Sequence, residues 1–184
     1  GSEGSPVLFV SGPPTSGEIF QRVQERLEPR QSIAITRLQD PGEFDSEAFA
    51  QELRKLCQSE GIRVVVAHGL ALPLVLDAQL ESLELLVISN GPLSGLDPFT
   101  RALSKVPCTL MEKVVLQPKI FNKWLASSVG LRRAVVNPYV MERDTVEALS
   151  RPFLESAQAR QLTNRWLKAL PKRLPAQLPA DTKV

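Results

Sequence analysis

The sequence has a single histidine, His68, and only two cysteines, Cys57 and Cys108. One histidine with two cysteines far apart in the sequence excludes the usual zinc-site spacings, so we expect no metal and no cofactor. Both cysteines lie in apolar sequence, and we predict that they are small core residues, without a disulfide, in the reducing cytoplasm.

The chain also lacks long hydrophobic runs and any excess of one charge. Its longest apolar stretches, such as Leu83 to Ser89, are too short to span a bilayer, and no basic and apolar leader opens it. The 22 Lys and Arg residues nearly cancel the 20 Asp and Glu residues. We therefore expect no nucleic-acid partner. We expect no membrane binding either through the few clustered cations (Arg132, Arg133, Lys168, Lys172 and Arg173).

What is present is an ordinary globular composition, with 184 residues of which 43% are hydrophobic. Strand-like runs at residues 7–10, 32–36, 63–67 and 85–89 alternate with helical patterns. The first helix is expected at 19–27, where Ile19, Phe20, Val23 and Leu27 share one face. The second runs from a cap at Asp45 or Ser46 to near Gly61, and the third covers residues 70–81. This alternation predicts an α/β fold with a short parallel sheet, whose sites form at the carboxyl ends of the strands.

After Asp97 the strand pattern disappears. Helices separated by prolines are predicted there instead, at residues 99–105, 110–116, 120–127, 144–149 and 153–170. Residues 171–184 contain three prolines and several charges, and they are predicted to be a flexible tail. Residues 1–5 are predicted to be a tag remnant or a disordered segment.

The glycine-rich turn after the first strand resembles a phosphate-binding loop only in its spacing. Gly12 and Gly17 are placed as in G-x-x-x-x-G-K-[ST], but Glu18 and Ile19 replace the lysine and the hydroxyl residue. A carboxylate facing phosphate, without a hydroxyl for magnesium, argues against nucleotide binding.

The same turn is more similar to the α/β-hydrolase superfamily. Ser11 to Ser16 (SGPPTS), followed by Phe20, resembles the family's H-G-x-P-T-S turn. Residues 63–79 (RVVVAHGLALPLVLDAQ) resemble the family's nucleophile strand and elbow. Residues 85–98 (LLVISNGPLSGLDP) resemble the strand that follows it. The resemblance covers residues 6–170. It implies a sheet order of 2-1-3-4 without the family's last strands, an α/β core at 6–108 and a helical lid-like region at 109–170.

The family's catalytic positions are altered in this chain. Gly69 stands where the resemblance places the nucleophile. Pro13 stands where the family has an oxyanion-hole donor, but proline has no N–H. The N–H of Leu70 would then be the remaining donor. No histidine follows the lid, where the family has its catalytic base. His68, at the second residue of the elbow, is interpreted as a packed structural residue. Asp97 then has no base to orient and is interpreted as a helix cap. The resemblance therefore implies a pseudo-hydrolase with vestigial positions only (Ser11, Gly12, Pro13, His68, Gly69, Leu70 and Asp97).

Three functional hypotheses follow. The first is a binding or assembly subunit that uses the apolar edge strand at 85–89 and the lid, with a protein partner or a second copy. The second is binding of a small hydrophobic ligand over Pro13, Gly69 and Pro92, although the aromatic residues concerned would also serve to pack the lid (Phe121, Trp124, Tyr139, Phe153 and Trp166). The third is a weak esterase with another nucleophile, namely Ser11, Ser94 or Cys108.

Overall fold

Four parallel strands form the sheet in the computed structural model, which describes residues 6–13, 17–27, 32–35, 44–92, 96, 98–127, 151 and 155–170. The strands are β1 (Val7–Ser11), β2 (Ser32–Ile35), β3 (Val64–His68) and β4 (Leu85–Ser89). Their order is β2-β1-β3-β4, and every neighbouring pair is parallel. The predicted order is confirmed, and the predicted strand ends differ by at most one residue.

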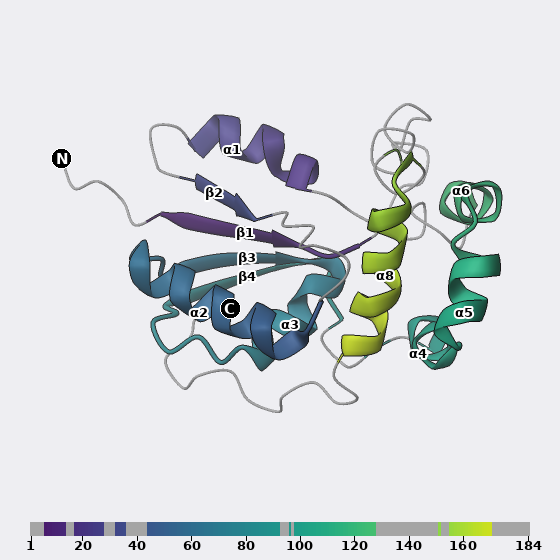
Figure 1. Ribbon diagram of the computed structural model, residues 1–184. Helices are drawn as coiled ribbons and strands as arrows, with labels where there is room; N and C mark the ends of the chain where they lie inside the picture. Colours follow the sequence, from purple (N-terminus) through teal and green to yellow (C-terminus); the bar gives the residue numbers. More distant parts are fainter. Residues whose placement is uncertain are drawn as a thin grey trace.

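Helices cover both faces of this sheet (Figure 1). On one face lie the 3₁₀ turn η1 (Gly17–Phe20) and helix α1 (Gln21–Leu27), and the ring of Phe20 packs 4.9 Å from that of Phe9. On the other face lie α2 (Ser46–Ser59) and α3 (Leu72–Asp77), which cover Leu8 and Val10. Alternation along β1 thus sends neighbouring side chains to opposite layers, as a strand covered on both faces requires.

Helix α2 begins and packs as its sequence predicts. The Asp45 side chain accepts a hydrogen bond from the backbone N–H of Glu47 at 3.3 Å, which caps the first turn. Phe49, Leu53 and Cys57 recur every fourth residue, and all three are buried against the sheet.

Helix α3 is shorter than the predicted helix at 70–81. The chain leaves β3 through a 3₁₀ turn, η2 (Gly69–Ala71), and α3 ends at Asp77. Gln79 adopts a left-handed backbone conformation with φ 48°, which cannot continue a right-handed helix. A further prediction is wrong: Cys108 is exposed rather than a core residue.

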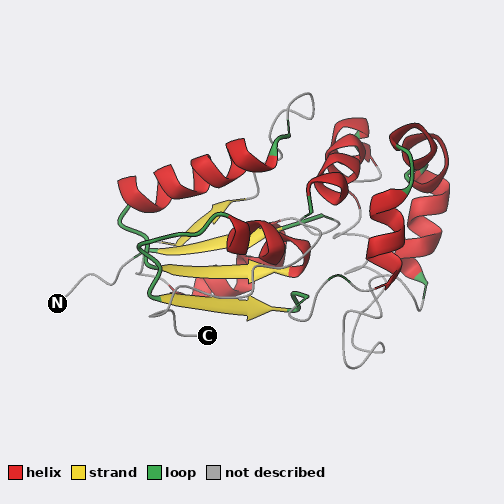
Figure 2. Ribbon diagram, turned by 90° about the horizontal axis from the view of Figure 1, so that it is seen from below, coloured by secondary structure: helices red, strands yellow, loops and turns green. Residues whose placement is uncertain are grey.

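The helical region lies beyond the carboxyl ends of the strands (Figure 2). It comprises α4 (Pro98–Lys105), α5 (Cys108–Leu110), the π-helical η3 (Met111–Val115), α6 (Pro118–Ala126) and α8 (Ala157–Ala169). Helix α8 starts later than the predicted residue 153, because Ser156 caps it by accepting from the N–H of Ala159 at 3.1 Å. The predicted helix at 144–149 and the tail at 171–184 lie outside the described residues.

The described helices include none that is long and apolar enough to cross a membrane.

Candidate functional site

Three polar residues stand side by side where β1, β3 and β4 end. The strand register pairs Ser11 with His68, and His68 with Ser89. The imidazole Nδ1 of His68 lies 3.1 Å from the hydroxyl Oγ of Ser89, within hydrogen-bonding distance. Sequence analysis missed Ser89, although equal placement at the ends of adjacent parallel strands was the signal that could have found it.

His68 is held in a partly buried environment. The rings of Phe20 and His68 form a T-shaped pair, with centroids 6.0 Å apart and an interplanar angle of 89°. Burial lowers the pKa of His68 below its ordinary value, because removing water disfavours the imidazolium. The ring is therefore neutral near pH 7, and its tautomer decides whether Nδ1 donates to Ser89 or accepts from it.

The turn after β3 has the backbone of a nucleophile elbow. Gly69 follows the strand directly, adopts φ +58° and leads into η2 and α3. Ala67 and Ala71, two residues to either side, are completely buried, as the crowded elbow requires small neighbours. A Cβ at Gly69 would meet nothing within 4 Å, so there is space for a side chain that glycine does not supply.

The loop after β1 lies directly against this elbow. A Cβ on Gly12 would lie 2.7 Å from the backbone N of Ala71 and 2.9 Å from the carbonyl carbon of Leu70, so only glycine fits there. The next residue, Pro13, is buried and has no N–H. The loop therefore packs directly on the elbow, and residue 13 offers no backbone N–H donor there.

Trp166 of α8 fills the space beside the loop and the elbow. Its indole Nε1 donates to the carbonyl oxygen of Leu70 at 3.0 Å. Its ring stacks on Phe44 with centroids 4.9 Å apart, and it meets Phe49 edge-on at 5.2 Å. Trp166 thereby joins α8, the elbow and the α2 layer in one core.

The other predicted aromatic residues differ in their surroundings. Phe121 is buried in the main core, and Trp124 is half-buried between the rings of Phe121 (5.6 Å) and Phe99 (5.8 Å). Their role in ligand binding stays a prediction. Several predicted site residues lie outside the described residues (Ser94, Asp97, Tyr139 and Phe153).

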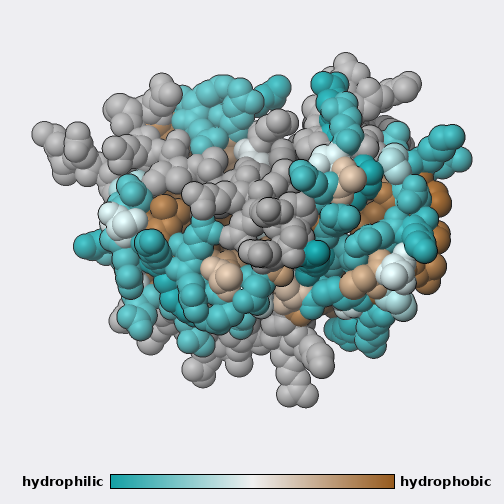
Figure 3. Space-filling model, viewed as in Figure 1, coloured by the Kyte–Doolittle hydropathy of each residue, from teal (hydrophilic) through white to brown (hydrophobic). Residues whose placement is uncertain are grey.

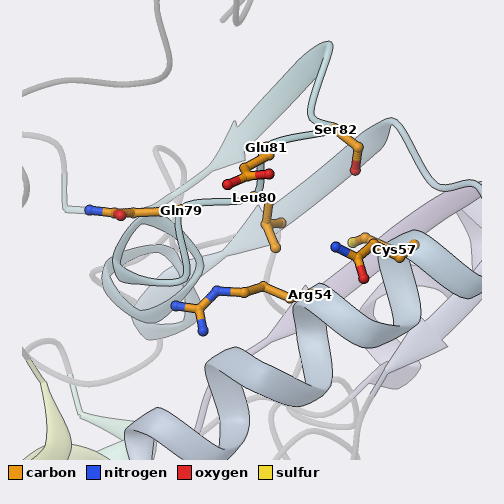
Figure 4. A pocket seen from close by; sticks show the side chains of 7 residues that line it. Arg54, Cys57, Gln79, Leu80, Glu81 and Ser82 are labelled. Carbon is orange, nitrogen blue, oxygen red and sulfur yellow. The ribbon is translucent and has the colours of Figure 1, made fainter.

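A cavity of about 390 Å³ lies away from the elbow (Figure 4). Arg54, Cys57 and Gln58 of α2 line one side, and residues 79–82, between α3 and β4, line the other. The Nε of Arg54 donates to the carbonyl oxygen of Ala78 at 2.8 Å, which ties the two walls together. Within the described part of the chain, no three His, Cys, Asp or Glu residues gather closely enough to hold a metal ion.

Comparison with solved structures identifies the architecture: the chain has the α/β-hydrolase fold. It is similar to Cfl2 from Burkholderia cenocepacia, with 18% identity and a TM-score of 0.68, covering 92% of this chain and 65% of that one. It is also similar to MenH from S. aureus, with 10% identity and a TM-score of 0.63, covering 91% and 68%.

A structure described among novel epoxide hydrolases of the α/β-hydrolase superfamily from hot-environment metagenomes matches as well. Its identity is 16% and its TM-score 0.55, covering 98% of this chain and 69% of that one. The chain thus spans about two thirds of the length of these neighbours, and identities this low establish the fold alone. Neither protein-family models nor curated protein sequences match the chain.

Proposed function

We propose that this protein is a non-catalytic binding or assembly subunit built on the hydrolase fold. The observation that carries the proposal is Gly69, which holds the left-handed elbow conformation with φ +58° but has no nucleophilic atom. Pro13 supports it, because removing one oxyanion-hole donor typically slows acyl transfer by about 10²–10³.

The proposed partner surface includes the side of β4 that faces away from β3. Among the described residues β4 pairs with β3 alone, and Val87 near this edge is 41% exposed. An apolar edge strand recruits another strand or another chain unless something covers it. A second copy or a protein partner would satisfy its backbone hydrogen bonds.

The first experiment tests catalysis. The purified chain and the Gly69→Ser variant are incubated with activated acyl esters and with a fluorophosphonate probe. The proposal predicts no saturable hydrolysis by either and no covalent adduct. A side chain at residue 69 meets no neighbour within 4 Å and bears only the backbone strain of φ +58°, so the serine variant is expected to fold and its inactivity would reflect missing chemistry. An adduct on the wild-type chain would overturn the proposal.

The second experiment tests assembly. We expect sedimentation velocity to show self-association, or association with a copurified protein, that Val87→Lys weakens, because a lysine beside an edge strand opposes pairing. Val23→Lys on α1 is the matched control, since Val23 is 47% exposed and lies away from the edge. A monomer with no partner, unaffected by Val87→Lys, would contradict the assembly role.

A second candidate function rests on the 3.1 Å contact between His68 Nδ1 and Ser89 Oγ. If Nδ1 accepts the hydroxyl proton, Ser89 Oγ can attack an activated acyl carbon, expelling the alcohol and leaving an acyl-serine for water to cleave. The same fluorophosphonate experiment separates the two candidates. A label on the Ser89 peptide that Ser89→Ala abolishes would support the esterase. The absence of any label would rule it out.

Binding of a small hydrophobic ligand remains a further prediction, supported by Trp124. Its indole Nε1 is buried and has no hydrogen-bond partner among the described residues. An acceptor atom on a ligand could satisfy it. Native mass spectrometry of the freshly purified chain should then show a retained small molecule, which Trp124→Phe would weaken.

A further inference from the structure

Four large apolar side chains are exposed on the helices beyond the sheet. They lie on α4, α5, η3 and α6, with exposed fractions between 43% and 50%, and we call this surface the outer helical face (Phe99, Leu110, Val114 and Ile120). Brown apolar atoms gather at the right-hand side of Figure 3, where Figure 1 draws these helices. Neither α4 nor α5 buries any of its residues completely.

These helices are fixed to one another, so the outer helical face is a preformed surface. Phe99 of α4 stacks on Trp124 of α6 at 5.8 Å. The Nε2 of Gln117 donates to the carbonyl oxygen of Glu112 at 3.0 Å, which braces η3 against the start of α6. From α8, Lys168 Nζ donates to the Ser104 carbonyl oxygen at 2.7 Å.

Cations accompany the apolar residues. Residues 98–126 contain five basic residues, all exposed (Arg101, Lys105, Lys113, Lys119 and Lys123), and one acidic residue, Glu112. Glu112 already accepts a hydrogen bond from Asn164 at 3.1 Å. This segment carries a net charge of +4, whereas the whole chain carries +2, so the rest of the chain is slightly acidic.

The charge decides which occupant fits. A second copy seated on the same face would bring +4 against +4. Protein interfaces are depleted in lysine, yet four of the five cations here are lysines. Apolar side chains rimmed by lysine and arginine are typical of helices that lie on anionic lipid.

We infer that the outer helical face docks on a membrane surface containing anionic lipid, with Phe99, Leu110, Val114 and Ile120 entering the headgroup boundary while exposed cations of residues 98–126 contact lipid charges. This is peripheral binding, not spanning. It goes beyond the binding role proposed above, and it does not depend on whether catalysis is lost. The sequence expectation against membrane binding considered other cations, such as Arg132 and Arg133, and had no information on which apolar residues between 99 and 120 are exposed.

The test is cosedimentation of the full chain with vesicles of phosphatidylcholine, alone or mixed with phosphatidylserine. We expect at least about ten-fold stronger partitioning onto the mixed vesicles, falling as salt is raised. Lys119→Gln with Lys123→Gln should lower partitioning by about five-fold for each cation removed. Ile120→Gln should lower it at every salt concentration, because it removes apolar contact rather than charge.

Matched controls lie on the other side of the molecule. Lys55→Gln on α2 and Val23→Gln on α1 change an exposed lysine and an exposed valine away from this face, and both should bind like wild type. Circular dichroism of every variant confirms folding. Equal binding to both vesicle types, or equal losses in the control variants, would overturn the inference. So would vesicle-independent capture of an acidic protein that only the face variants lose, because the face would then belong to a protein partner.

Discussion

Trp166 donates its indole N–H to the carbonyl oxygen of Leu70 across 3.0 Å, although 96 residues separate them in the sequence. Leu70 belongs to the turn after β3, and Trp166 lies on the last described helix. This contact holds α8 against the turn after β3.

Substitution of Trp166 tests this link. Trp166→Phe keeps most of the aromatic packing with Phe44 and Phe49 but leaves the partly buried Leu70 carbonyl without this donor, so we expect a loss of about 0.5–1.5 kcal/mol. Trp166→Ala should cost about 3–5 kcal/mol, because it also opens a cavity. Urea denaturation of both variants measures the two terms. Equal losses would mean that the aromatic packing which phenylalanine retains contributes nothing, and that the hydrogen bond accounts for the whole effect.

Two glycines at the elbow should respond differently to the same substitution. Gly12→Ala puts a Cβ 2.7 Å from a backbone nitrogen, and we expect a cost of about 2–3 kcal/mol. Gly69→Ala meets no neighbour within 4 Å and bears only the strain of φ +58°, about 1–2 kcal/mol. Denaturant midpoints with unchanged slopes provide the comparison. A larger loss at Gly69 would refute the proposed open elbow.

Most element ends were predictable because they depend on local patterns, whereas the strand order was predicted from the resemblance to the hydrolase superfamily. Apolar runs bounded by turn residues define β1 to β4, and the Asp45 cap marks the start of α2. The end of α3 was not predictable, since helix-favouring residues continue past Asp77 while the backbone at Gln79 turns left-handed.

The candidate site was predictable only in part. The resemblance to hydrolases located Gly69 and Pro13, because those positions follow strand ends in the sequence. The Ser89 contact with His68 depends on strand register, and the Trp166 contact with Leu70 depends on packing between distant segments. Ser89 could have been found from its place at the end of the predicted strand after β3, whereas the Trp166 contact has no local sequence signal. The exposure of Cys108 likewise follows from where α5 lies, not from its apolar neighbours.

Removal of the Ser11 hydroxyl should not destabilise the protein. Ser11 Oγ is buried and has no hydrogen-bond partner among the described residues. Burying an unpaired hydroxyl is unfavourable, so Ser11→Ala should be neutral or stabilising by up to about 1 kcal/mol. Thermal and urea unfolding measure this, with Trp166→Phe as the contrasting loss of a made hydrogen bond. A loss above about 1 kcal/mol would reveal a hydrogen-bond partner that the described residues do not supply.

The two cysteines should differ sharply in reactivity. Burial raises the pKa of the Cys57 thiol to about 11, whereas Cys108 is exposed at the start of α5. Because the thiolate is the reactive form, iodoacetamide at mildly alkaline pH should alkylate Cys108 first and Cys57 only after unfolding. Peptide mass spectrometry locates the adducts, and Cys108→Ser should abolish the fast phase. Equal rates in the native protein would contradict the burial of Cys57.

His68 should make stability fall in acid. Burial lowers its pKa in the folded state, so below the ordinary value of 6.5 the unfolded chain binds a proton that the folded chain resists. Its contribution is therefore complete above about pH 6.5 and is lost progressively as the pH falls toward the lower folded value. We expect the free energy of unfolding at pH 5.5 to be smaller than at pH 7.5.

The control for this titration is His68→Gln, which retains a hydrogen-bonding side chain beside Ser89 but cannot titrate. Urea denaturation at both pH values gives the pH dependence of each protein, and subtracting the variant's dependence removes the carboxylates that both chains share. The wild type should lose more stability than the variant on acidification. An identical pH dependence would show that His68 is as well solvated in the folded state as in the unfolded chain, and the opposite sign would show a carboxylate stabilising its charged form.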